Sequence, residues 1–131
     1  MGSLLYLDSS AIMKLVVSEP ETAALRRLLH SWPERVSSVL SHVEVLRAAR
    51  RIGADARRRA PGVLQGLTLI QLDEQVIERA SSLEPAQLRS LDAIHVATAL
   101  SLGDELGAMC AYDARLAEAA SSLDIAVIAP A

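Results

Sequence analysis

Four acidic residues lie at the ends of expected strands or near the starts of expected helices, where folding could bring their side chains together. Asp8 directly follows the apolar run Leu4–Leu7, and Asp113 follows a second apolar run, while Glu44 and Asp92 fall in the first turns of two expected helices. Two carboxylates about 5 Å apart repel by about 3 kcal/mol at an effective dielectric near 20, so such a cluster needs raised pKa values or a bound cation. Oxygen ligands alone favour a hard ion, Mg²⁺ or Mn²⁺, over zinc.

Each acid also has a local interpretation. Asp8 and Asp113 precede expected helices and could cap them. Glu44 lies three residues after Ser41, which is the spacing of a capping box. Asp92 lies in the first turn of a nearly apolar helix, where the helix dipole favours an anion. A buried acid at that place still requires a cation, and the four acids together point to a shared one.

Histidine and cysteine do not form a zinc or redox site in this sequence. His30, His42 and His95 lack the spacing of zinc ligands, and His95 lies three residues after Asp92 on the same helical face, where a supporting partner is expected rather than a ligand. Cys110 is the only cysteine, which excludes an internal disulfide and a CxxC pair. A reducing compartment, the cytoplasm, is therefore expected.

The elements that would position these residues predict one α/β domain over residues 1–131. The chain has 131 residues, 51% of them hydrophobic, and short apolar strands alternate with helices, which predicts a five-stranded parallel sheet flanked by helices on both faces. Ligands collect at the carboxyl ends of such strands. The expected strands are 4–7, 36–40, 67–72, 107–112 and 125–128. The expected helices are 10–17, one between 20 and 32, 41–52 ending at Gly53, 73–83, 90–102 and 114–123, with a less regular one at 55–66 around Pro61-Gly62.

Charge is unevenly distributed. The net charge is -3, and the apolar runs are far shorter than the roughly 20 residues of a membrane-spanning helix, so no membrane partner is expected. With only three aromatic residues, base stacking would contribute little to nucleic-acid binding. Six arginines crowd one stretch that holds a single acid, and they could grip RNA phosphates, dock a protein partner or form a solvated helix face: Arg47, Arg50, Arg51, Arg57, Arg58 and Arg59.

Four short motifs in this order resemble the PIN-domain ribonucleases, specifically the VapC-type toxins of bacterial toxin-antitoxin pairs. They are LYLDSSA at residues 5–11, VEVLRA at 43–48, LDAIHVATA at 91–99 and YDARL at 112–116. Each motif alone is weak, but four in family-like order are specific and span nearly the whole chain.

The resemblance implies a single PIN-like nuclease domain with Asp8, Glu44, Asp92 and Asp113 as its acidic quartet, assisted by the hydroxyl of Ser9 or Ser10. Asp8, Asp92 and Asp113 would hold Mg²⁺ or Mn²⁺ directly or through water. Glu44 would position the attacking water or help to bind a second ion. The implied reaction is hydrolysis of RNA to 5'-phosphate and 3'-hydroxyl ends. The implied partners are a cognate antitoxin and a second copy of the chain in a homodimer.

One departure and two alternatives stand beside this interpretation. The family often has Thr or Ser two residues before its last acid, and this sequence has Ala111. A PIN-like module with impaired catalysis, acting through partner or RNA binding, is one alternative. An aspartyl-phosphate phosphatase or receiver domain is another, but the phosphatase would need a second Asp at Ser10, and the receiver a late lysine, whereas the only lysine is Lys14.

Overall fold

The computed structural model describes residues 2–131. One sheet holds five strands in the order β3-β2-β1-β4-β5, and every neighbouring pair is parallel, as the alternation of strands and helices predicted. The strands are β1 (Leu4–Leu7), β2 (Glu34–Ser38), β3 (Thr68–Ile70), β4 (Leu106–Cys110) and β5 (Val127–Ile128). The helices are α1 (Ser9–Val16), α2 (Thr22–Leu29), α3 (Val39–Ile52), α4 (Ala54–Gln65), α5 (Glu74–Ser82), α6 (Ser90–Leu100) and α7 (Ala114–Ser122), with a short 3₁₀ helix, η1 (Gly103–Glu105), before β4.

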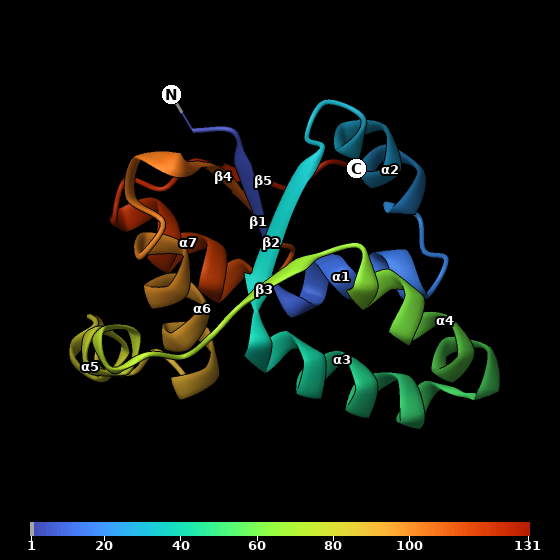
Figure 1. Ribbon diagram of the computed structural model, residues 1–131, viewed down its shortest axis with the longest axis horizontal. Coiled ribbons are helices and arrows are strands. Elements are labelled where there is room, and N and C mark those ends of the chain that lie inside the picture. Colours follow the sequence, from blue (N-terminus) through green and yellow to red (C-terminus); the bar gives the residue numbers. More distant parts are fainter. Residues whose placement is uncertain (1) are drawn as a thin grey trace.

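The central strand β1 shows why the sheet is covered on both faces. Successive side chains of a strand point to opposite faces. Leu5 and Leu7 pack in a cluster with residues of α1 to α4, and Tyr6 packs in the cluster of α6 and α7. Figure 1 shows these two groups of helices on either side of the strands, with α5 outside α6. An apolar run without alternation is therefore what this position requires.

The carboxyl ends of the central strands lead directly into helices. Asp8 is the one residue between β1 and α1, and β2 passes without a break into α3, as Figure 1 shows near the centre of the molecule. Three residues separate β4 from α7, the last of them Asp113. Because β1 lies between β2 and β4, these three junctions meet at one edge of the sheet.

Several expected boundaries were wrong by one or two residues; for example, β3 ends at Ile70 instead of residue 72, β4 ends at Cys110 instead of residue 112, and β5 begins at Val127 instead of residue 125. β2 ends at Ser38 and α3 begins at Val39, so the helix starts two residues earlier than the expected Ser41. Pro61 and Gly62 do not interrupt α4, because Pro61 lies on the exposed side, where water can bond to the carbonyl that the ring leaves unpaired. Gly53 ends α3 as expected, with a φ of 152° that other residues rarely adopt. Across residues 2–131, none of the helices has the length and apolar character of a membrane span.

Candidate active site

Asp8 is a buried carboxylate, 3% exposed, at the carboxyl end of β1. It caps α1 as expected, since it accepts the Ala11 N–H at 2.9 Å, and the Ser10 hydroxyl donates to its two oxygens at 2.7 and 2.8 Å. Burial raises the pKa of Asp8, and the negative charge of Asp113 adds to the rise, while the Ser10 and Ala11 hydrogen bonds and His95 oppose it. The helix cap therefore does not fully compensate the charge of Asp8.

The two carboxylate oxygens of Asp113 accept hydrogen bonds from different partners. Oδ1 caps α7 by accepting the N–H groups of Arg115 and Leu116 at 2.9 and 3.2 Å. Oδ2 accepts a hydrogen bond from Nη2 of Arg89 at 2.9 Å. The capping interpretation of this acid is therefore right, but it accounts for only one of the two oxygens.

Asp92 meets the same guanidinium. Asp92 is buried in the first turn of α6, and its Oδ2 accepts a hydrogen bond from Nε of Arg89 at 2.9 Å. Asp8 reaches the same place through Ser10, whose hydroxyl accepts the N–H of Tyr112 next to Asp113 at 2.9 Å. Residues far apart in sequence thus converge at one sheet edge around a positive charge.

Glu44 does not form the expected capping box. Ser38, not Ser41, caps α3, so Ser41 is a residue of the first helical turn and Glu44 lies in the second. The hydroxyl of Ser41 lies 2.7 Å from the hydroxyl of Ser37. Its carboxylate instead accepts hydrogen bonds from the hydroxyl of Ser9 and from Nε2 of His95. Burial alone would raise the pKa of Glu44, but these two bonds outweigh it and lower the pKa. The side chain is held as an ionised acceptor.

His95 is fixed from behind by a buried tyrosine. The Tyr6 hydroxyl lies 2.7 Å from Nδ1 of His95, and both residues are almost fully buried. Burial raises the pKa of Tyr6 well above its ordinary value, so the phenol stays protonated. Its O–H group therefore donates a hydrogen bond to Nδ1 of His95. The imidazole then carries its own proton on Nε2, which lies 2.7 Å from Oε1 of Glu44. His95 therefore supports an acid, as the sequence predicted, although the acid is Glu44 rather than Asp92.

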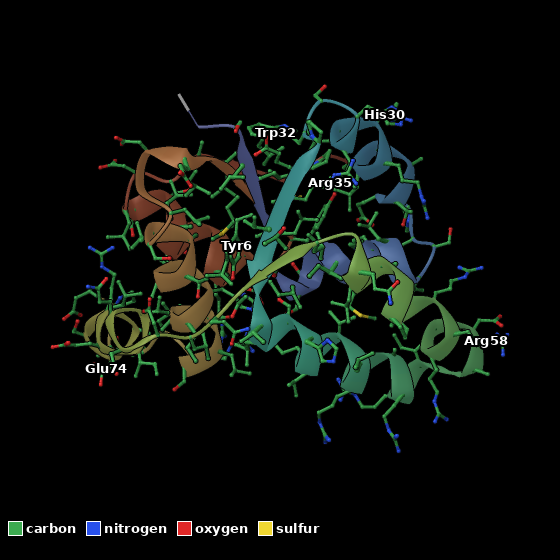
Figure 2. The ribbon with its side chains drawn as sticks, in the orientation of Figure 1. Tyr6, His30, Trp32, Arg35, Arg58 and Glu74 are labelled. Atoms are coloured by element: carbon green, nitrogen blue, oxygen red, sulfur yellow. The ribbon has the colours of Figure 1, made fainter. Side chains whose placement is uncertain are left out.

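The six clustered arginines lie outside this group. All six are exposed on α3 and α4, and only Arg47 lies within one turn of Glu44. Arg58 pairs with Asp55, and Figure 2 shows Arg58 at the far end of α4, well away from Tyr6. Of the six expected RNA-binding arginines, the structure thus places only Arg47 next to one of the four acids along a helix.

Arg89 is the site residue that sequence reasoning missed. It lies directly before α6, where the positive end of the helix dipole disfavours a cation. The sequence does contain one indication of its role. Arg89 lies three residues before Asp92, at the end of the helix whose dipole repels a cation, so a nearby anion is needed to hold it there. The cation that buried Asp92 requires is this side chain.

The donor set suits a hard divalent ion, but the ligands are not preassembled. Within residues 2–131, no group of three or more His, Cys, Asp or Glu side chains is placed to hold a metal ion as it stands. The guanidinium of Arg89 lies between Asp92 and Asp113 and separates them. The acids around it offer carboxylate oxygens, which are the ligands that Mg²⁺ and Mn²⁺ prefer. The chemistry of these carboxylates therefore fits such an ion.

Replacing Asp8 by Asn is expected to stabilise the metal-free protein. Burial makes the Asp8 charge unfavourable, and an Asn at this cap can still accept the Ala11 N–H. We expect the free energy of unfolding at neutral pH to rise by about 1 to 3 kcal/mol, the range that mutational data give for burying a polar group that is not fully compensated.

The gain in the free energy of unfolding of Asp8→Asn should shrink as the pH falls. An acid with a raised folded-state pKa destabilises the fold above that pKa, and the penalty disappears as the pH falls through it towards the ordinary value of 3.8. Urea unfolding in EDTA should therefore show the largest difference between Asp8→Asn and the unmodified chain near neutral pH, and a vanishing one near pH 4. A difference that grows on acidification would contradict the assigned environment of Asp8.

Comparison with known proteins decides the family. The sequence profile described as PIN domain matches residues 5–122. The chain belongs to the PIN-domain family. Ribonuclease VapC46 of Mycobacterium tuberculosis is 51% identical over 126 residues, which cover 96% of this chain and 97% of the relative. Ribonuclease VapC35 of the same organism is 39% identical over 131 residues, covering 97% of each chain. These relatives confirm that the chain is a VapC-type PIN ribonuclease.

Solved structures confirm the PIN fold at low sequence identity. Mycobacterium tuberculosis VapC20, described as a toxin that cleaves the sarcin-ricin loop, has a TM-score of 0.75 at 18% identity, covering 96% of this chain and 99% of its own. A toxin-antitoxin complex from Klebsiella pneumoniae contains a chain with a TM-score of 0.67 at 22% identity, covering 83% of this chain and 86% of its own. Because the family match and the curated relatives place the chain in the PIN-domain family, the receiver and phosphatase alternative is rejected.

Ala111, the departure from the family motif, is buried in this VapC-type protein. It is 1% exposed and belongs to the apolar cluster of Tyr6 and Met109 between the sheet and the α6–α7 face. The methyl group therefore contributes to the core, and it supplies no hydroxyl to the neighbouring acids.

Proposed function

We propose that this VapC-type PIN protein is a metal-dependent endoribonuclease, the toxin of a toxin-antitoxin pair. Asp8, Asp92 and Asp113 are proposed to hold Mg²⁺ or Mn²⁺. The observation that carries the proposal is that Asp92 and Asp113 converge on one positive charge, that of Arg89, while the buried carboxylate of Asp8 lies close enough to Asp113 for its pKa to be raised by that charge. Relatives named as ribonucleases support RNA as the substrate. We propose the cytoplasm as the working compartment, because a chain with one cysteine suits a reducing compartment.

The chain's own residues divide the chemistry between them. When bound, the divalent ion lowers the pKa of water and offsets charge on the phosphoryl group. Glu44, kept ionised by Ser9 and His95, orients the attacking water and accepts its proton. Tyr6 fixes the tautomer in which His95 donates to Glu44. Ser10 orients Asp8 and ties it to the backbone beside Asp113. The proposed products are RNA fragments with 5'-phosphate and 3'-hydroxyl ends.

Removing the metal tests this function directly. The purified protein should cleave a mixed RNA pool in the presence of Mg²⁺ or Mn²⁺, lose cleavage in EDTA and recover it when Mg²⁺ is restored. The Asp92→Asn variant, purified in parallel, controls for contaminating nucleases. Equal cleavage in EDTA, or equal cleavage by the variant, would overturn the proposal.

The partners are proposals of the same kind. We propose a cognate antitoxin and a homodimer, and the antitoxin is supported by the toxin-antitoxin complex from Klebsiella pneumoniae, which contains a chain of similar fold. Two arginines of α4, Arg58 and Arg59, line a hollow of about 710 Å³ whose floor includes Leu15 and Leu29. A basic rim over an apolar floor suits a partner segment with acidic and apolar side chains, so the arginine cluster has two candidate roles, RNA and antitoxin binding.

Replacing Arg57, Arg58 and Arg59 by Ala separates the two roles. If these side chains contact RNA phosphates, binding weakens, and the slope of log affinity against log salt falls by about 2, since each lost contact to a single strand removes about 0.7. Fluorescence anisotropy with an uncleavable RNA measures both quantities, and Arg79→Ala on the exposed side of α5 is the matched control. An unchanged slope would reject the RNA role and leave the antitoxin role.

A further inference from the structure

The Arg89 guanidinium spans two acids that approach it from different elements. Nε donates to Asp92 at the start of α6, and Nη2 donates to Asp113 before α7, each at 2.9 Å. The Asp92 side chain is only 10% exposed, whereas that of Arg89 is 58% exposed. The arginine therefore reaches in from the surface, and its charged end lies between Asp92, which is largely buried, and Asp113, whose side chain is 30% exposed.

The acids, and not the local helix, hold the side chain in this place. Arg89 precedes α6 at its positive dipole end, so the helix itself disfavours the charge. The hydrogen bond to Asp92 is the main reason that the pKa of Arg89 is raised, and the charge of Arg89 also lowers the pKa of Glu44. Among residues 2–131, its recorded side-chain hydrogen bonds are the two to carboxylates. If those carboxylates bound another cation, no other side-chain hydrogen bond within residues 2–131 would hold the guanidinium in this position.

We propose that Arg89 is an internal counter-ion that occupies the cation position of the metal-free protein and must swing out before a divalent ion binds. This inference rests on the proposed function, because it concerns the same acids. It explains why Asp92 and Asp113 can lie together without a metal, and why no three carboxylates are preassembled as ligands in the described part of the chain. A ligand that binds only the open fraction of molecules shows an apparent affinity reduced by that fraction. The arginine therefore sets the metal concentration at which the site becomes loaded.

Calorimetric titration with Mn²⁺ alone tests the competition without relying on activity. Arg89→Gln removes the competing charge, and we expect Mn²⁺ to bind about tenfold more tightly than to the unmodified chain. Arg89→Lys keeps the charge but cannot span two carboxylates with one planar fork, so its affinity should lie between the two. Arg115→Gln is the matched control. It removes an arginine two residues from Asp113 whose side chain has no recorded ion pair within residues 2–131, and it should change the affinity less than twofold.

The unmodified chain provides a second readout. In a ¹⁵N spectrum, the Nε–H signal of Arg89, assigned by its loss in Arg89→Gln, should shift during a Mg²⁺ titration as the bond to Asp92 is lost. Equal Mn²⁺ affinity in Arg89→Gln, together with an unmoved Nε–H signal, would overturn the counter-ion role and leave a metal-dependent nuclease standing. Absence of Mn²⁺ binding to both proteins would overturn the proposed function itself and the inference with it.

Discussion

Replacing Asp92 by Asn is expected to reduce metal-dependent RNA cleavage by about 1,000-fold. Asn has nearly the same shape but no charge, so it weakens the hold on a divalent ion and leaves phosphoryl charge uncompensated. A thousandfold loss corresponds to about 4 kcal/mol of transition-state stabilisation, within the range of a metal acting as Lewis acid. Asp8→Asn should have an effect of the same size, because Asp8 lies at the same sheet edge. Initial rates on a fluorescent RNA with saturating Mn²⁺ measure both.

The fold must survive for this loss to bear on catalysis. Circular dichroism and urea unfolding should show intact proteins, with Asp8→Asn more stable than the unmodified chain in EDTA. Asp104→Asn changes an exposed carboxylate in η1, before the amino end of β4, and serves as the matched control with full activity. Retained cleavage by both Asp8→Asn and Asp92→Asn would reject the metal assignment of these acids.

The second large effect concerns Glu44 and the histidine that holds it. Glu44→Gln should lower kcat by about 100-fold, because a positioned base contributes about 10² to 10⁴. Binding of RNA and of Mn²⁺ should change little. His95→Ala should cost about tenfold, and the double variant should be no slower than Glu44→Gln alone, since His95 acts through Glu44.

The pH dependence separates positioning from a general loss of stability. The hydrogen bond from His95 helps lower the pKa of Glu44, so its removal raises that pKa. The base form is then lost at a higher pH, and the acid limb of the kcat profile should move upward in His95→Ala. His42→Ala, an exposed histidine on the same helix as Glu44, should leave the profile unchanged. Additive losses, or an unmoved acid limb, would contradict the role of His95.

Local patterns were sufficient for the sheet and for two of the acids. The buried run of β1 and the alternation of strands with helices predicted the parallel sheet, and Asp8 and Asp113 follow strands that meet at one edge. Their capping bonds are local interactions within three residues, so the sequence could predict them.

Glu44 and Arg89 show what local patterns could not provide. Two serines, Ser38 and Ser41, can both cap a helix, and the later one gave a capping box that the structure does not form. The partner that decides the orientation of Glu44 is His95, 51 residues away, and no spacing rule connects them. Arg89 lies outside the stretch in which six arginines are crowded, so charge density along the sequence does not single it out. Its place beside Asp92 and Asp113 in the fold makes it part of the site.

The position of a bound ion tests the central claim most directly. Crystals grown with Mn²⁺ should show an anomalous scattering peak at about 2.1 Å from carboxylate oxygens of Asp8, Asp92 and Asp113, with the Arg89 guanidinium displaced from Asp92. A fully occupied Mn²⁺ site elsewhere, or none at a millimolar concentration with Arg89 still bridging the two acids, would contradict a shared divalent ion at this sheet edge.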